Sequence, residues 1–163
     1  MKQYGDTNLD VPYSDNRCRE YGRSWCSDEL KSYALKHLIQ AANQVTSAED
    51  AWVLIGGSYV IQVCSNRGFA RTRDNDGFLK ARGTWDHALS VIGRRTTASG
   101  RRGFLVLNSW GEDWCSGPLF EDQPKGSFYC DFNTMDGMLR QGDSFNLIDF
   151  HGFRPIKLDW SEI

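Results

Sequence analysis

The chain contains 163 residues, which is enough for one domain that buries roughly two thirds of its unfolded surface. Its contents of 40% hydrophobic, 25% charged and 13% aromatic residues are those of a globular protein and exclude a disordered chain. The 19 basic and 21 acidic residues nearly cancel, so no overall field attracts the chain to nucleic acid or to an anionic membrane.

Cysteine usage and the chain start favour a reducing, cytoplasmic compartment. The sequence MKQYGDTNLD lacks the charged and apolar regions of a secretion signal, and no apolar run approaches the ~20 residues of a membrane span. Without CxxC pairs or zinc-ligand spacing, no metal or other cofactor is expected. The chain has five cysteines: Cys18, Cys26, Cys64, Cys115 and Cys130. Their odd number argues against a complete disulfide framework, while a single disulfide stays open.

The first half of the chain predicts two helices and two strands. Residues 1–25 show no sustained period, and Ser27-Asp28-Glu29 is typical of the start of a helix that runs to Leu38. A short strand is expected over 39–45. Ser47 is the predicted N-cap of a helix through Ile55, which Gly56-Gly57 ends. The β-branched run 59–64 predicts a buried strand, and a loop is expected over 67–83.

A hairpin is the central prediction of the second half. Residues 87–93 alternate as in a strand, 103–107 form a second strand, and 96–102 supply the turn. His87 begins the first strand and Asn108 follows the second, so an antiparallel pairing makes them neighbours across 21 positions. A loop over 112–125, a strand over 126–132, a helix capped by Asn133-Thr134 and ending at Leu139, and a strand over 144–150 complete the chain. No repeat or linker divides it, so residues 1–163 are expected to form a single domain.

His87 and Asn108 are the candidate catalytic pair. A histidine that acts as general acid and base needs an acceptor on one ring nitrogen, and an amide oxygen can serve. Two other clusters have simpler interpretations. The arginines at 94, 95, 101 and 102 are typical of a solvated hairpin tip rather than a phosphate site, and Asp74 with Asp76 of a solvated turn rather than a cation loop.

The flanking residues resemble the papain-like cysteine peptidases. The shared motifs are Asp86-His87-Ala88, followed after a hairpin by Asn108-Ser109-Trp110-Gly111, with Trp114 and Gly126-Ser127-Phe128-Tyr129 further along. The resemblance implies that His87 is the general base and imidazolium partner of a thiolate, that Asn108 orients its ring, and that Trp110 shields their hydrogen bond. Ala88 and Ser109 would shape the site, with Ala88 near the specificity pocket.

The resemblance covers most of the chain but only the second, β-rich half of the family's fold. It implies an α+β protein, with an antiparallel, β-barrel-like sheet and two or three short helices, corresponding to the right-hand domain of the papain-like fold. The segments 65–69, 73–78 and 142–145, together with the motif 108–111, are weakly similar to large papain-like proteins of bacteriophages and environmental bacteria. That similarity would make the chain a C-terminal piece, located in the cytoplasm or in a virion.

The nucleophile is the missing component. The family's cysteine lies well over a hundred residues before its histidine, whereas only 86 residues precede His87. Cys26 is the best candidate in the chain, because a helix N-terminus stabilises a thiolate and its spacing suits a compact papain-like peptidase. No oxyanion-hole glutamine precedes it in the right context. Cys64, at a strand end, is typical of an inert core residue.

Two functions therefore remain open. The first is a cysteine-peptidase module in which His87 and Asn108 serve a thiolate from a partner chain, from a missing half or from Cys26, with a peptide or protein as substrate. The second is a non-catalytic papain-like scaffold that acts as a structural or binding subunit, for example of a phage particle. Neither involves nucleic acid or a membrane.

Overall fold

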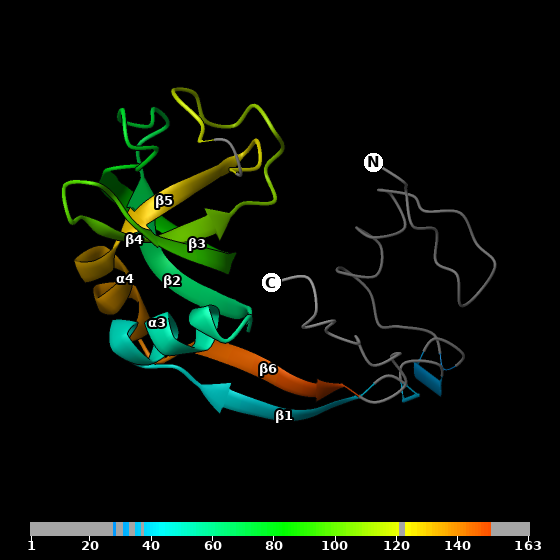
Figure 1. Ribbon diagram of the computed structural model, residues 1–163. Coiled ribbons are helices and arrows are strands. Elements are labelled where there is room, and N and C mark those ends of the chain that lie inside the picture. Colours follow the sequence, from blue (N-terminus) through cyan, green and yellow to red (C-terminus); the bar gives the residue numbers. More distant parts are fainter. Residues whose placement is uncertain (1–27, 29–30, 33–34, 37, 121–122, 151–163) are drawn as a thin grey trace, which may run out of the picture. The chain divides into compact units, whose positions relative to one another are not determined.

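The computed structural model describes residues 28, 31–32, 35–36, 38–120 and 123–150 (Figure 1). The chain divides into two compact units, residues 1–40 with 149–163, and residues 41–148. Most of the first unit is outside the described residues. The helix expected to begin at Ser27 falls largely there, as do Cys18 and Cys26.

A six-stranded antiparallel sheet organises the described chain. Its strands are β1 (Ile39–Gln44), β2 (Ile61–Phe69), β3 (Ala81–Thr96), β4 (Arg102–Leu107), β5 (Ser127–Asp131) and β6 (Ser144–Phe150), in the spatial order β1-β6-β2-β3-β4-β5. With two helices in the described part, the expected α+β class is confirmed. The strands do not close on themselves, so a barrel is not confirmed.

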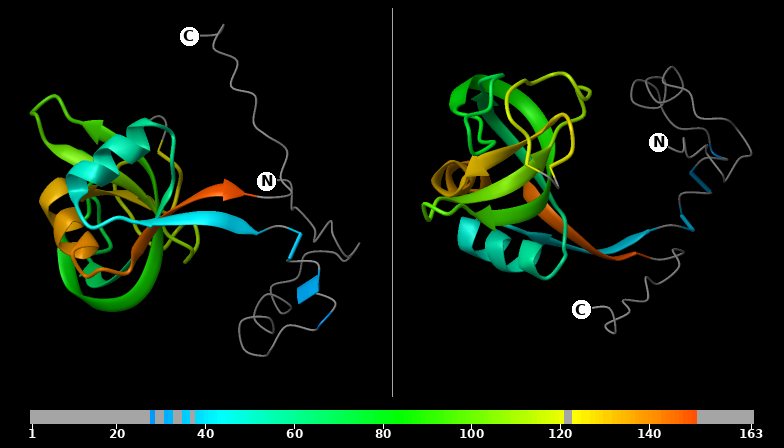
Figure 2. Two further views of the ribbon diagram at one scale, coloured as in Figure 1. Left: turned by 90° about the horizontal axis from the view of Figure 1, so that it is seen from below. Right: turned by 45° about the horizontal axis from the view of Figure 1, so that its top comes forward.

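The two helices, α3 (Ala48–Gly56) and α4 (Phe132–Leu139), lie beside each other against the sheet (Figures 1 and 2). Each turns one stripe towards the core, because its buried residues recur at three- and four-residue steps. In α3 these are Ala48, Ala51 and Ile55, and in α4 they are Met135, Met138 and Leu139.

The start of α3 confirms its predicted cap, whereas the start of α4 does not. Ser47 adopts an extended backbone, and its hydroxyl accepts a hydrogen bond from the Asp50 amide at 3.1 Å. Asn133-Thr134 was the expected cap of α4, but the N-cap is Asp131, two residues earlier, and its side chain caps no backbone amide. The Asp131 carboxylate is instead bonded to Arg101, which explains why it is unavailable to the helix.

The predicted hairpin is confirmed. β3 pairs antiparallel with β4, with Val91 opposite Val106 and Ser90 opposite Leu107, and the turn occupies 97–101. The strand lengths differ from those expected, because β2 continues to Phe69 and β3 begins at Ala81. The loop expected over 67–83 is therefore confined to 70–80, because Arg67 pairs with Thr84 and Phe69 with Ala81 in the irregular register of β2 and β3.

The 70–80 connection lies along the outer edge of β5. Leu79 donates its amide to the carbonyl of Tyr129 at 3.0 Å, and the Tyr129 amide donates to Gly77 at 3.0 Å. Phe78 is 1% exposed and packs against the Tyr129 ring. The edge of β5 is thus covered by backbone hydrogen bonds and by an aromatic contact.

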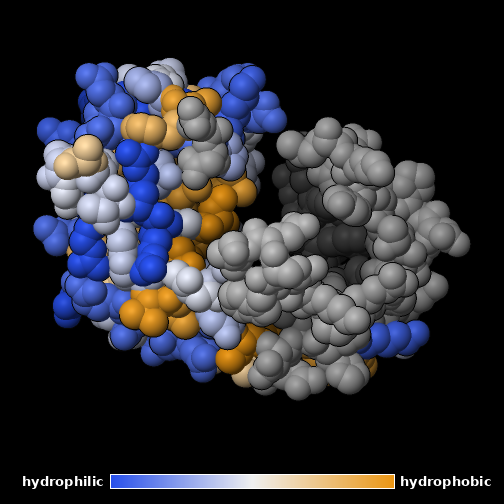
Figure 3. Space-filling model, viewed as in Figure 1, coloured by the Kyte–Doolittle hydropathy of each residue, from blue (hydrophilic) through white to orange (hydrophobic). Residues whose placement is uncertain are grey.

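The surface of the described residues is mainly hydrophilic in the view of Figure 3, with hydrophobic side chains, coloured orange, visible between the polar ones. Among the described residues, no helix is both long and apolar enough to cross a membrane.

Candidate active site

The β3-β4 hairpin positions His87 and Asn108 on one face of the sheet. Side chains alternate along a strand, so His87 shares a face with Leu89 and Val91, four residues away. Asn108 lies two residues beyond Val106, whose partner across the hairpin is Val91. His87 and Asn108 therefore continue the row of Leu89, Val91 and Val106 towards the end of the hairpin opposite its turn.

His87 and Asn108 are joined by a hydrogen bond. The Asn108 Oδ1 atom lies 2.9 Å from His87 Nε2, and an amide oxygen can only accept, so Nε2 carries the proton of the neutral ring. No described residue forms a hydrogen bond with Nδ1. The pair is thus arranged so that Nδ1 is the nitrogen that can exchange a proton with a third group.

Trp110 covers this pair. Its ring stacks on the imidazole of His87, with centroids 4.6 Å apart and an interplanar angle of 20°. Trp85 and Trp114 pack edge-on or tilted around Trp110, at 4.8 and 5.7 Å. The Trp110 ring covers one face of the imidazole, while Trp110 itself remains 46% exposed.

Asn108 is held in a nearly closed environment. It is 7% exposed, and its Nδ2 atom is buried without a hydrogen-bond partner among the described residues. An unmatched amide donor in such a place costs on the order of 1–3 kcal/mol. Among the described residues, the contact of Oδ1 with His87 is therefore the hydrogen bond that the Asn108 side chain makes.

Two glycines shape the turn that carries Trp110. Gly111 has φ of 99°, a left-handed conformation that glycine adopts without strain. Gly126 has φ of 75°, and a Cβ atom there would lie 2.5 Å from the carbonyl oxygen of Gly111. Since Trp114 also donates its indole N–H to the Gly126 carbonyl, the 108–114 turn is fixed against the start of β5.

Arg73 holds the segment that follows Trp114. It is 6% exposed and donates to the carbonyl oxygens of Pro118 at 2.9 Å, Gly117 at 3.0 Å and Ser127 at 2.8 Å. A fourth contact joins its Nη1 to the Cys115 sulfur at 2.8 Å. No acidic side chain pairs with this guanidinium among the described residues. Arg73 therefore acts as a structural clamp between the 70–80 connection and the 115–118 segment.

None of the three described cysteines has the properties of a thiolate. Cys115 and Cys130 are buried, and burial raises the pKa of both thiols, that of Cys130 well above its usual range. Cys64 lies within β2, not at a strand end, and is half-buried rather than buried. Burial and the nearby Asp143 raise its pKa too. Cys26 is outside the described residues, so its placement relative to His87 is not part of the structure.

Cys64 nevertheless lies close to the candidate pair. It pairs with Ala88 across β2 and β3, and Ser65 pairs with His87. These residues border a cavity of about 410 Å³, which is completed by Asn66 and Asp86 and by Gln141 and Asp143 from the turn between α4 and β6. Ala88 lies in the cavity wall, whereas Ser109 is exposed on the Trp110 turn.

The contribution of Gln141 and Asp143 was not recognisable from the sequence. They are more than 50 positions from His87, and only the pairing of β6 with β2 brings their turn to the cavity. No local motif encodes that pairing.

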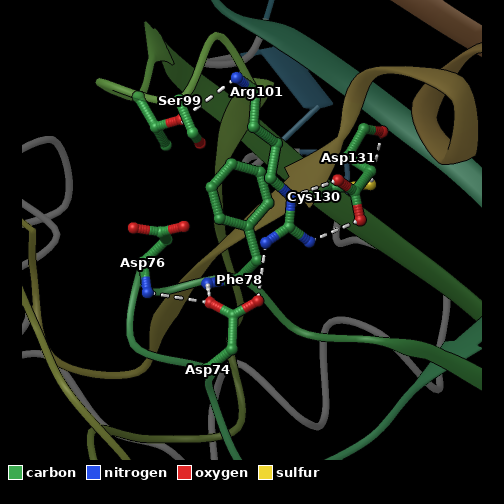
Figure 4. A network of polar contacts seen from close by, with 8 residues as sticks. Asp74, Asp76, Phe78, Ser99, Arg101, Cys130 and Asp131 are labelled. Atoms are coloured by element: carbon green, nitrogen blue, oxygen red, sulfur yellow. Dashed lines mark hydrogen bonds and ion pairs between the residues drawn. The ribbon is translucent and has the colours of Figure 1, made fainter.

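The arginine-rich hairpin and the Asp74 turn form one network (Figure 4). Arg101 binds both oxygens of Asp131, at 2.6 and 2.8 Å, and Asp74 at 2.6 Å, while Asp74 accepts the amides of Asp76 and Phe78 at 3.0 Å each. Burial opposes ionisation of Asp74, but these donors outweigh it, and the pKa of the carboxyl lies below its usual range.

The other three arginines also have intramolecular contacts. Arg102 binds Glu49 with two nitrogens, Arg94 donates to the Trp52 carbonyl, and Arg95 stacks on the ring of Phe120. The four guanidinium groups therefore hold the hairpin to its neighbours. Within the described ranges, no group of three or more His, Cys, Asp or Glu side chains is placed to bind a metal ion.

Comparison with known proteins gives no family. The chain matches no model of a known protein family, and no curated protein is significantly similar to it.

Proposed function

We propose that this chain supplies the histidine and asparagine of a Cys-His-Asn site of the papain-like cysteine peptidase type, with the thiolate coming from a second chain, from a further part of the protein or from Cys26. The observation that carries the proposal is the 2.9 Å hydrogen bond between His87 Nε2 and Asn108 Oδ1. It leaves Nδ1 as the nitrogen that faces a reaction partner.

The chemistry follows from that arrangement. His87 accepts the thiol proton at Nδ1, and the resulting imidazolium is stabilised by Asn108 at Nε2. The thiolate sulfur adds to the carbonyl carbon of a peptide or isopeptide bond. The C–N bond breaks when His87 returns the proton to the leaving amine, and water then cleaves the thioester to the acid and the free thiol.

Trp110 supports the same assignment. An imidazole–amide bond that is exposed to water competes with hydration, and an indole stacked at 4.6 Å shields it on one side. The surrounding tryptophans and the Gly111 turn keep that indole in place. A histidine with only a structural role would gain little from a site in which Asn108 carries an unpaired buried amide nitrogen.

A second candidate function is a non-catalytic scaffold of the same type. It is favoured by the cysteines that the structure describes, because the pKa of each of the three thiols is raised rather than lowered. In this alternative the chain acts as a structural or binding subunit, and the His87–Asn108 pair is retained without a nucleophile.

Labelling with a peptidyl epoxide, a thiol-directed activity probe, separates the two. The full chain is treated alone and together with the product of the neighbouring gene, and the labelled cysteine is identified by mass spectrometry. For the peptidase we expect one labelled thiol, in Cys26 or in the partner, whose labelling rate falls about 10²-fold or more in His87→Ala. Asn108→Ala should slow it less.

Asn75→Ala is the matched control, since Asn75 is an exposed amide in the 70–80 connection. Its labelling rate should equal that of the unmodified chain. Absence of labelling under both conditions, or labelling that does not change in His87→Ala, would exclude the peptidase and favour the scaffold.

A further inference from the structure

The cavity beside His87 is lined by three segments that lie far apart in the sequence. Its walls come from three places: Cys64 to Asn66 of β2, Asp86 to Ala88 of β3, and the turn between α4 and β6. Its volume of about 410 Å³ is in the range of small-ligand sites, which is ~300–1,000 Å³. His87 is among the lining residues, so a group bound in the cavity lies beside the strand segment that carries the candidate base.

Two carboxylates dominate the charge of this cavity. Asp86 and Asp143 line it from different elements, and no lysine or arginine is among its lining residues. Neither carboxylate forms an ion pair or a side-chain hydrogen bond with another described residue. Elsewhere in this part of the chain, the carboxylates of Glu49, Asp74, Asp131 and Asp136 all bind arginines. Asp86 and Asp143 are therefore the acidic side chains of this cavity, and neither is engaged by another described residue.

Two hydrogen bonds join Asn66 and Gln141, which are both lining residues of the cavity. The Asn66 backbone amide donates to Gln141 Oε1 at 2.9 Å, and Gln141 Nε2 donates to Asn66 Oδ1 at 3.0 Å. This double contact fixes the α4-β6 turn against β2 and so holds Asp143 in place. The Cys64 amide reinforces it by donating to the Asp143 carbonyl at 3.2 Å.

The remaining lining is suited to an aliphatic chain. Ala88 and Cys64 are paired across the two strands and offer a methyl group and a neutral thiol. The pKa of the Cys64 thiol is raised by burial and by Asp143, which agrees with a negative field in the cavity. A long cationic side chain places its stem on such a surface and its charge at the carboxylates.

We propose that this cavity binds a lysine or arginine side chain of a peptide, with Asp86 and Asp143 receiving its charged end. The identification of the peptide as a substrate rests on the proposed function, whereas binding of the side chain does not require catalysis. The class of ligand is therefore a basic peptide, and Asp143, from an element remote in sequence, is a specificity-determining residue.

Peptide titrations of the full ¹⁵N-labelled chain test the proposal. Four blocked tripeptides that differ only in a central Lys, Arg, norleucine or Glu are added, and amide shifts are followed by NMR. The Lys and Arg peptides should shift the amides of Asn66, His87 and Asp143 and bind roughly fivefold more tightly than the norleucine peptide. The Glu peptide should bind most weakly, and added salt should reduce the preference.

Variants distinguish this cavity from general surface charge. Asp143→Asn and Asp86→Asn should each weaken binding of the Lys peptide roughly threefold, and the double variant should remove its advantage over norleucine. Asp143→Glu keeps the charge and should keep the preference. Asp76→Asn is the matched control, because it removes an equal charge in the 70–80 connection, and should leave binding unchanged.

Three results would overturn the proposal: equal binding of the Lys and norleucine peptides, an equal effect of Asp76→Asn, or no shift with any peptide at millimolar concentration. The ¹⁵N spectrum of each variant shows whether it is folded. The peptide titrations test binding of the side chain, and the activity-probe labelling tests catalysis by His87. Each can fail while the other succeeds, so the two proposals are refuted separately.

Discussion

Replacement of Arg73 by methionine should destabilise the unit that contains the candidate site by about 2–3 kcal/mol. The buried contact to the Ser127 carbonyl is charge-assisted and contributes roughly 1.5–3 kcal/mol, and the contact to the neutral Cys115 thiol, a weak acceptor, adds about 0.5–1 kcal/mol. The carbonyls of Gly117 and Pro118 belong to exposed residues and can be rehydrated. Removal of a buried guanidinium also relieves part of its desolvation cost, which brings the net effect down to the stated value.

Urea unfolding followed by tryptophan fluorescence measures this change. Arg73→Lys keeps the charge but loses the planar fork, so it should be destabilised nearly as much. Arg71→Met is the control: Arg71 is exposed, its side chain has no hydrogen bond to the described residues, and its replacement should change stability by less than about 0.5 kcal/mol. If Arg73→Met were as stable as the unmodified chain or more stable, the desolvation cost would cancel or outweigh the four contacts, and Arg73 would not stabilise the fold.

Two further outcomes can be measured on the same protein. Ser47→Ala should lower the unfolding free energy by about 1 kcal/mol, because the hydroxyl that caps α3 is lost. Ser47→Thr keeps a hydroxyl and should retain most of that stability. Equal stability of Ser47→Ala and the unmodified chain would contradict the cap. For Cys64, alkylation followed by mass spectrometry should reach half its maximal rate at a higher pH than for a cysteine in an unfolded peptide, because the folded-state pKa is raised. Asp143→Asn should move that profile to lower pH, and a profile below that of the free peptide would refute the assigned environment.

The hairpin and the contact between His87 and Asn108 could be predicted because their signals are local. The two strand segments, 87–93 and 103–107, are separated by a short turn, which predicts that they pair antiparallel. That pairing alone brings His87 and Asn108 together. The same holds for the cap at Ser47, which needs only its own helix start.

Features that depend on distant pairing could not be predicted. The strand of residues 67–69 looks like a loop, because Arg67 and Gly68 carry no apolar alternation, yet it pairs with the start of β3. Asp131, the N-cap of α4, makes no side-chain cap because its carboxylate binds Arg101, which is 30 positions away. Likewise, Asp143 reaches the cavity only through the pairing of β6 with β2.

The confinement of His87 and Asn108 to a single hairpin has a consequence for folding. Closing a hairpin is a local event that takes on the order of 1–10 μs, whereas the pairing of β2 with β6 must join segments about 80 positions apart. The imidazole–amide contact can thus assemble early and independently of the strands that complete the sheet. The wall that Asp143 supplies requires the pairing of β2 with β6 in addition, so partial unfolding from the β6 side would remove the cavity while leaving the hydrogen-bonded pair intact.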